Sequence, residues 1–179
     1  MCVSGQKRLI LKSSIMIHLI IGIPDSGKSE LAERLILEMS KGRPVYYIAT
    51  MIPYGDEGLR RVAKHRRMRE GKGFITVEMP FDAGSMILPE DSCVLLECVS
   101  NLAANEMFGR HIPADKCEEK IVSDIGKLAV SVSDMVIVTN HFDITEEFDG
   151  ETILYSLMMD RINHKLSVLA DKVTDLRTR

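Results

Sequence analysis

The chain has 179 residues, 45% of them hydrophobic, and a formal net charge of −3. This length suffices for one domain with a sizeable core. We find no run of 18 apolar residues, so no membrane span is expected, and the slight acidity argues against nucleic-acid binding over the whole surface. The cysteines Cys2, Cys93, Cys98 and Cys117 lack zinc-like spacing, which favours a reduced, cytoplasmic protein, and the apolar run around Cys93 and Cys98 predicts that these two are buried thiols.

Residues 1–15 form a segment distinct from the rest of the chain. They have a weak signal-peptide look, but Lys12 and two serines interrupt the apolar part and an apolar run follows at once. We expect a poorly ordered N-terminal extension over residues 1–15 and a single domain over residues 16–179.

Short apolar runs alternate with helical patterns from one end of the chain to the other. The runs predict strands at 17–21, 45–49, 74–77, 93–98 and 135–139, and stripes of apolar residues predict core-facing helices at 31–39, 121–132 and 153–169. Such alternation is typical of an α/β fold in which helices flank a mainly parallel sheet. Ligands of such sheets bind at the carboxyl ends of the strands.

Residues 22–29 fit the phosphate-binding pattern G-x-x-x-x-G-K-[ST] at every fixed position, directly after the first predicted strand. The alternative, a glycine turn that binds nothing, lacks this strand-to-helix context. Glycine at 22 and 27 lets the backbone curl round phosphate oxygens. Lys28 is expected to contact the β- and γ-phosphates, and Ser29 to bind Mg²⁺ through its hydroxyl.

Polar residues close several predicted strands at the edge where the phosphate loop lies. They are Thr50, Glu78, Glu97 and Asn140. Glu97 ends a buried run, as an acid that orders Mg²⁺ would, so we predict that Glu97 and Ser29 share the metal. A strand-end glutamate can also be merely solvated or cap a helix, and only the phosphate loop favours the metal interpretation.

Residues 60–72 include seven Lys or Arg among thirteen, within an acidic protein. Such a segment is usually a solvated helix face, and the absence of interleaved aromatics weakens a nucleic-acid interpretation. Near a phosphate loop it is better explained by a triphosphate and its displaced pyrophosphate. His65 lies in this segment, and a neutral imidazole nitrogen can attack an α-phosphate to form a phosphoramidate.

These motifs together resemble a known family. Five segments occur in the same order as in that family: Gly22-x-x-x-Ser-Gly-Lys-Ser29, Tyr47-Ile-Ala-Thr50, Arg61-Val-x-x-His65-Arg66, Leu95-Leu-Glu97 and Arg161-Ile-Asn163. The chain is similar to the bifunctional adenosylcobinamide kinase / adenosylcobinamide-phosphate guanylyltransferase family of cobalamin biosynthesis over roughly residues 16–173.

The resemblance implies two reactions. ATP or GTP phosphorylates adenosylcobinamide, and GMP then passes from GTP through a guanylylated histidine to adenosylcobinamide phosphate, giving adenosyl-GDP-cobinamide. By position His65 is that histidine, with Lys28 as its catalytic partner. The nucleotide contacts implied are Gly22, Ile23, Pro24, Asp25, Ser26, Gly27, Lys28, Ser29, Ile48, Ala49, Thr50, Arg66, Arg67, Met68, Arg69, Glu78 and Glu97. The family also implies a homotrimer.

Three departures from the family keep other interpretations open. The family's phosphate loop usually contains an arginine, which this chain lacks because it has Pro24 and Asp25. After Asn140 the family has a glycine-rich loop, whereas this chain is acidic and has no glycine before Gly150. After Val173 the family has a hydrophobic strand, whereas residues 174–179 contain no such run, so the last strand is expected to be missing. A small-molecule kinase without a covalent intermediate, or a degenerate GTP/ATP-binding protein, remain as alternatives.

Overall fold

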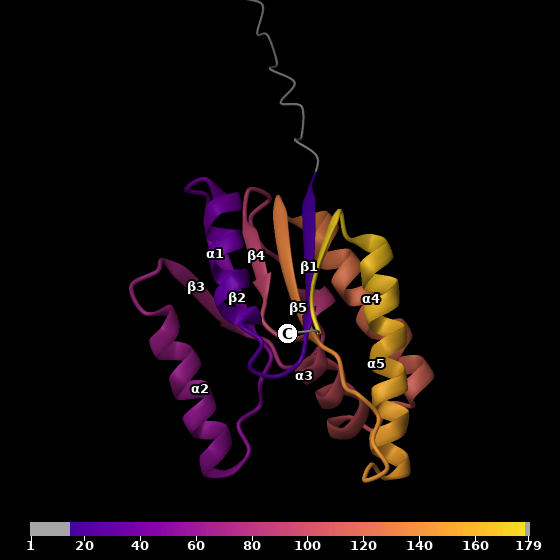
Figure 1. The fold of residues 1–179 in the computed structure, drawn as a ribbon. Coiled ribbons are helices and arrows are strands. Elements are labelled where there is room, and N and C mark those ends of the chain that lie inside the picture. The colour runs from indigo at the N-terminus through magenta and orange to yellow at the C-terminus, as the bar shows by residue number, and fades with distance from the viewer. Residues whose placement is uncertain (1–14, 178–179) are drawn as a thin grey trace, which may run out of the picture.

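A computed structural model describes residues 15–177, and all its strands form one parallel sheet in the order β3-β2-β4-β5-β1-β6 (Figure 1). The predicted segment 1–15 lies, apart from Ile15, outside these residues. The strands are β1 (Met16–Gly22), β2 (Val45–Ala49), β3 (Phe74–Glu78), β4 (Cys93–Leu96), β5 (Asp134–Asn140) and β6 (Lys172–Leu176). The helices are α1 (Lys28–Ser40), α2 (Gly55–Arg69), α3 (Val99–Ala104), α4 (Ala114–Ser131) and α5 (Gly150–Leu169), with a 3₁₀ turn at Ala83–Ser85 and a π turn at Asn105–Gly109.

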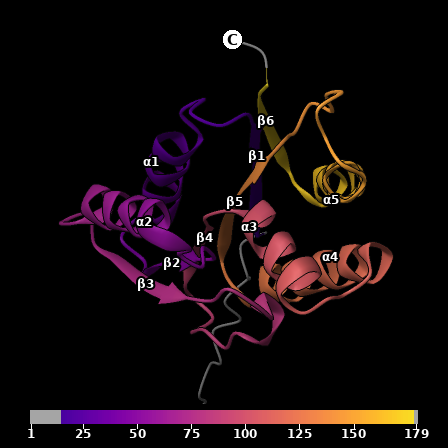
Figure 2. The same cartoon turned by 90° about the horizontal axis from the view of Figure 1, so that it is seen from below.

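The five predicted strands and the α/β fold are confirmed, with boundaries shifted by at most two residues. Helices cover both faces of the sheet: α1 lies on one face, and α3, α4 and α5 lie on the other (Figure 2). Strand residues alternate between the two cores. In β1, for example, Leu19 and Ile21 join the core under α4 and α5, while Ile20 packs with Ile36 of α1. Among residues 15–177, no helix is long and apolar enough to cross a membrane.

The expectation that the last strand is missing was wrong. β6 pairs in parallel with β1 from His18↔Lys172 to Gly22↔Leu176. It forms without an apolar run because an edge strand needs backbone pairing and only modest burial. Asp171, which precedes β6, stabilises the start of this pairing, because the Asp171 carboxylate accepts a 2.7 Å hydrogen bond from the Ile17 amide.

The apolar stripe predicted as the core face of the last helix is divided in the structure. Met158, Ile162 and Leu166 are buried, as predicted, whereas Leu154 and Leu157 are 44% and 43% exposed. α5 lies at the border of the molecule and packs chiefly against α4, so only part of its apolar surface is covered. Cys93 and Cys98 are buried free thiols, as expected, and Cys117 is a third; Cys2 lies outside the described residues.

Helix α2 differs from the others because it buries almost nothing. Arg69, in its last turn, is its one buried residue. Glycines at 55, 71 and 73, all with positive φ, flank the helix. A helix this polar gains little from tertiary packing. Its position relative to the sheet therefore depends on a few contacts, which include the ion pair between Arg66 and Glu78 at the end of β3.

Gly84, in the 3₁₀ turn, shows how closely the loop after β3 packs on α4. A Cβ at this position would lie 2.6 Å from Oδ1 and 2.7 Å from Cα of Asp124. Gly84→Ala is therefore expected to lower the free energy of unfolding by about 1–3 kcal/mol, measured by urea denaturation. Gly126→Ala, in open space on α4, is the control and is expected to gain up to about 1 kcal/mol. Equal stability of the two variants would contradict the packing argument.

Candidate active site

The phosphate loop connects the end of β1 to the start of α1 at the carboxyl edge of the sheet. Gly27 precedes α1 with φ 83°, a left-handed conformation that suits glycine. A Cβ on Gly22 would lie 2.6 Å from Ser26 Oγ and 3.1 Å from Lys28 Cδ, so this glycine gives the lysine its room. Lys28 is 8% exposed and donates to the Ile23 carbonyl, and its burial lowers its pKa. The loop thus presents one enclosed ammonium.

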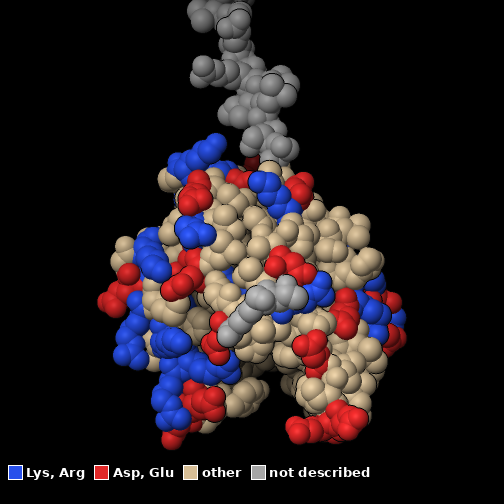
Figure 3. All heavy atoms as spheres, in the orientation of Figure 1, with Lys and Arg blue, Asp and Glu red and all other residues tan. Residues whose placement is uncertain are grey.

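A cavity of about 470 Å³ opens beside this loop. The phosphate loop forms one side and α2 the other, so Lys28 and His65 line the same space. Its lining comprises Pro24, Asp25, Ser26, Gly27, Lys28, Ser29, Glu30, Met51, Arg61, Lys64, His65, Met68, Glu97, Cys98, Asn101, Val138 and Asn140. Lys and Arg side chains gather over α2 at the lower left of Figure 3, next to this cavity. A polyphosphate would therefore meet positive charge from two sides.

His65 and Glu97 lie side by side in the lining of the cavity. Its Nδ1 atom lies 3.2 Å from Oε1 of Glu97, within ion-pair distance although not aligned as a hydrogen bond. The carboxylate is 8% exposed and the imidazole 24%. Because the carboxylate sits on the Nδ1 side, it favours a proton there and leaves Nε2 as the nitrogen with a free lone pair. Catalytic contacts are often looser without substrate than with it.

Glu97 is a buried acid in a mixed environment. Burial raises its pKa, while the charge of His65, the hydroxyl of Tyr47 and the guanidinium of Arg69 oppose the shift. The ionised form is therefore less favourable in the folded chain than in the unfolded chain. This contribution to stability is fully present below the ordinary pKa of 4.5 and is lost as the pH rises through that value toward the raised one.

Glu97→Gln keeps the shape of the side chain and removes its titration. The stability of the variant relative to wild type is therefore expected to increase from about pH 4 to about pH 8, because only wild type must ionise a buried carboxyl group. Urea denaturation at several pH values measures this difference. Glu38→Gln, an exposed change on α1, is the control. A difference that stays flat or falls with pH would contradict the assignment.

A second, smaller pocket of about 50 Å³ adjoins the cavity and shares Met51, His65 and Glu97 with it. Its remaining lining is Ala49, Pro53, Val62, Arg66, Arg69 and Glu78. The Arg69 guanidinium lies 3.8 Å from the ring centroid of Tyr47, and its buried Nε and Nη1 atoms have no hydrogen-bond partner. The pocket combines apolar walls with the carboxylate of Glu78, which forms an ion pair with Arg66.

Most of the predicted site residues line one of these two spaces, and five do not. Ile48 is fully buried in the core, and Thr50 is fully buried with its hydroxyl donating to the Cys98 carbonyl at 2.9 Å. Arg67 is exposed and donates back to Ala63 of its own helix. Gly22 and Ile23 belong to the phosphate loop without lining the cavity. The side chains of Ile48 and Thr50 therefore belong to the packing behind the site, and that of Arg67 points away from it along α2.

Several lining residues were absent from the predicted set. Asn140 could have been included, because it follows a predicted strand at the carboxyl edge of the sheet. Arg61 and Lys64 could have been included as members of the basic segment 60–72. Met51 and Asn101 carry no recognisable signal in the sequence, because only the fold brings them to the cavity.

A family model described as cobinamide kinase / cobinamide phosphate guanyltransferase matches residues 18–176. The chain belongs to this family. A curated relative, the bifunctional adenosylcobalamin biosynthesis protein CobP of Pseudomonas aeruginosa, is 39% identical over 88 residues. That match covers 48% of this chain and 49% of the relative, so it spans about half the length of each.

Two solved structures also show similarity. A KaiC-like protein, PH0186 of Pyrococcus horikoshii, is 12% identical with a TM-score of 0.43, covering 70% of this chain and 61% of that one. The RadB recombinase is 21% identical with a TM-score of 0.45, covering 80% and 70%.

The residues present fit a magnesium ion. The Ser29 hydroxyl and the Glu97 carboxylate line the same cavity, and both are hard oxygen donors of the kind that Mg²⁺ prefers. Ser29 and Glu97 would hold the ion at the phosphate loop. When bound, it would supply neutralisation of charge on the phosphate oxygens.

Proposed function

We propose that this chain phosphorylates adenosylcobinamide and transfers GMP from GTP to adenosylcobinamide phosphate through a guanylylated His65. The observation that carries the proposal is that Lys28 and His65 line one cavity, with Glu97 beside the imidazole. A simple kinase needs the lysine but has no use for a histidine held in this way. The family match supports both activities.

The transfer step follows from the geometry of His65. Nε2 attacks the α-phosphorus of GTP, a new N–P bond forms, and the bond from the α-phosphorus to the bridging oxygen breaks to release pyrophosphate. The imidazole becomes positively charged, and Glu97 stabilises this charge from the Nδ1 side. A phosphate oxygen of the acceptor then attacks the same phosphorus, and His65 leaves as neutral imidazole.

Charge on the departing pyrophosphate is met by the residues around the cavity. Lys28 contributes from the phosphate loop, and Arg61 and Lys64 from α2. Because Lys28 is buried, its charge acts in a region of low dielectric, where an ion pair is stronger than in water. In the kinase reaction we assign the same lysine to the transferred γ-phosphoryl group.

The smaller pocket is the proposed place for the guanine base. Its walls are apolar at Ala49, Met51 and Val62, which suits the faces of a purine ring. Glu78 can accept hydrogen bonds from N1–H and the 2-amino group of guanine, in exchange for its present pairing with Arg66. Adenine offers neither donor at these positions, so the pocket would favour GTP in the transfer step.

An assay with two labels tests the proposed function. With adenosylcobinamide, γ-labelled nucleotide is expected to label the corrinoid. With adenosylcobinamide phosphate, α-labelled GTP is expected to give labelled adenosyl-GDP-cobinamide. Label from the first reaction alone would indicate a kinase without guanylyl transfer, and no label from either reaction, despite nucleotide binding, would indicate a degenerate binding protein.

We also propose a homotrimer located in the cytoplasm, as the family resemblance implies, with a corrinoid as the small-molecule partner and no nucleic acid. The exposed apolar residues Leu154, Leu157 and Val168 of α5 support an oligomer, because they offer surface that a second copy could cover. Light scattering of the purified protein tests this, and a monomer at micromolar concentration would contradict it.

A further inference from the structure

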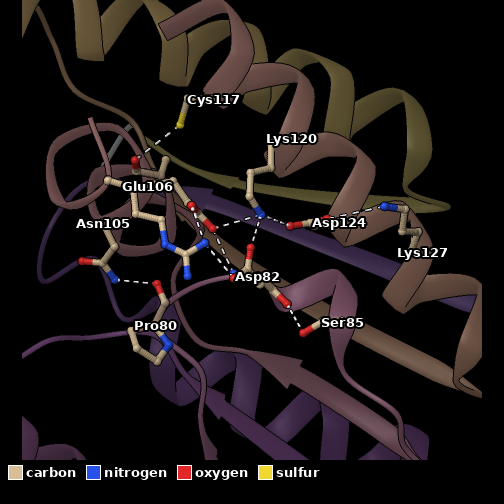
Figure 4. A network of polar contacts seen from close by, with 11 residues as sticks. Pro80, Asp82, Ser85, Asn105, Glu106, Cys117, Lys120, Asp124 and Lys127 are labelled. Atoms are coloured by element: carbon tan, nitrogen blue, oxygen red, sulfur yellow. Dashed lines mark hydrogen bonds and ion pairs between the residues drawn. The ribbon is translucent and has the colours of Figure 1, made fainter. Parts of the chain in front are cut away.

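The turn that joins α3 to α4 carries two buried polar residues that do not line either pocket. Asn105 and Glu106 begin a π turn, and they are 8% and 0% exposed. π turns within helical segments often occur near functional sites. Figure 4 shows both side chains extending from this turn toward the segment that follows β3. Buried polar groups need partners, so their partners indicate what they hold in place.

Asn105 joins two loops at the carboxyl edge of the sheet. Its Nδ2 atom donates to the Thr50 carbonyl at 2.8 Å and to the Pro80 carbonyl at 2.9 Å. The first carbonyl follows β2 on the segment that leads into α2, and the second lies two residues after Glu78. Both amide hydrogens are thus used on two different loops. A carboxylate of the same shape could donate to neither.

Glu106 fixes the same loop from the next position. Its Oε1 atom accepts a 2.9 Å hydrogen bond from the Asp82 amide and lies 3.1 Å from Lys120 Nζ. Lys120 also contacts Asp82 at 2.7 Å and Asp124 at 2.6 Å (Figure 4). The ammonium of Lys120 therefore occupies the centre of this acidic cluster. The loop after Glu78 is thus held by Glu106 of the π turn and by Lys120 of α4.

Asn105 therefore contacts the two loops beside the smaller pocket, where the guanine base is proposed to bind, without lining that pocket itself. We propose that Asn105 is a positioning residue for guanine recognition, and that it acts by holding the loops of Thr50 and Pro80 so that Glu78 faces the pocket. The inference rests on the proposed function, in which Glu78 contacts the base. Thr50 links Asn105 to the residue after Glu97 as well, since the Thr50 hydroxyl donates to the Cys98 carbonyl.

Equilibrium binding of GTP and of ITP, each with EDTA in place of Mg²⁺ so that His65 is not guanylylated, tests the proposal without depending on turnover. ITP lacks the 2-amino group, so the ratio of its Kd to that of GTP reports the contact with Glu78. Wild type is expected to favour GTP by roughly tenfold or more, and both Asn105→Asp and Glu78→Gln to lose most of that preference. If Asn105→Asp fails to fold, Asn105→Ser, which retains one donor, is expected to lose part of the preference.

Asn163→Asp is the matched control. Asn163 is 6% exposed and also joins two groups, accepting from the Thr139 hydroxyl at 2.7 Å and donating to the Asn140 carbonyl at 3.0 Å, both at the end of β5. It is expected to lose stability as Asn105→Asp does and to keep the GTP preference. A preference retained in Asn105→Asp, or lost equally in Asn163→Asp, would overturn the positioning role. A wild type that binds both nucleotides equally would instead overturn the proposed base contact, and the positioning role with it.

Discussion

Replacing His65 with alanine is expected to abolish guanylyl transfer while phosphorylation of cobinamide remains measurable. The transfer step needs a nucleophile that forms a bond to the α-phosphorus, and His65 is the residue whose Nε2 is available while Nδ1 faces Glu97. We expect the transfer rate to fall by roughly 10³-fold or more. Phosphoryl transfer depends on positioning and charge at the phosphate loop and has no covalent step on the protein.

Two assays on one preparation measure this separation, one with γ-labelled nucleotide and one with α-labelled GTP. His164→Ala is the matched control, because His164 is exposed on α5 and does not line the cavity. It is expected to retain both activities. Transfer at the wild-type rate by His65→Ala would show that the nucleophile is assigned wrongly. Equal loss of both reactions would indicate that the histidine serves the shared cavity and not the transfer step alone.

Replacing Lys28 with alanine is expected to impair both reactions together, each by roughly 10²–10³-fold in kcat/KM. Lys28 is the buried cation of the phosphate loop, and Lys28→Arg is not expected to restore activity because the compact ammonium is enclosed by the loop. Burial already lowers the pKa of Lys28, so its charge is not favoured by folding. The variant is therefore expected to remain folded, and the loss to be one of function.

Steady-state kinetics with a matched surface variant measure the effect of Lys28. Lys116→Ala, on the exposed side of α4, removes the same side chain where it forms an ion pair with Glu119. It is expected to retain wild-type kcat and KM for both substrates. If Lys28→Ala slowed only one of the two reactions, they would not share the phosphate loop, and a single cavity for both would be contradicted.

The fold could be predicted in most of its parts because the physical signals were local. Each of the five apolar runs became a strand, and the phosphate-loop pattern defined the turn from β1 to α1. β6 could not be predicted in this way. Its residues are largely exposed and polar, and it forms because β1 offers backbone groups to pair with. Which apolar residues of α5 are buried likewise depends on the helices beside it. The hydrophobic pattern of α5 alone does not predict those neighbours.

Those residues of the candidate site whose side-chain chemistry is distinctive, such as a nucleophile, a buried cation or a metal ligand, could be predicted from the sequence. His65, Lys28, Ser29 and Glu97 line one cavity, although they come from distant parts of the sequence. Ile48 and Thr50 were expected to contact nucleotide, and the structure instead buries their side chains within the fold. Asn105 carried no signal at all, since its importance lies in which two carbonyls it meets. Residues that act through others become visible only in three dimensions.

The most direct measurement of the central claim uses wild-type protein, Mg²⁺ and α-labelled GTP without acceptor. Label is expected to remain on the protein, to be removed by acid and resist base as a phosphoramidate does, and to map to the peptide that contains His65. Adenosylcobinamide phosphate is then expected to discharge it as adenosyl-GDP-cobinamide. Absence of protein-bound label, in a preparation that binds GTP and forms the product, would contradict the guanylylated histidine.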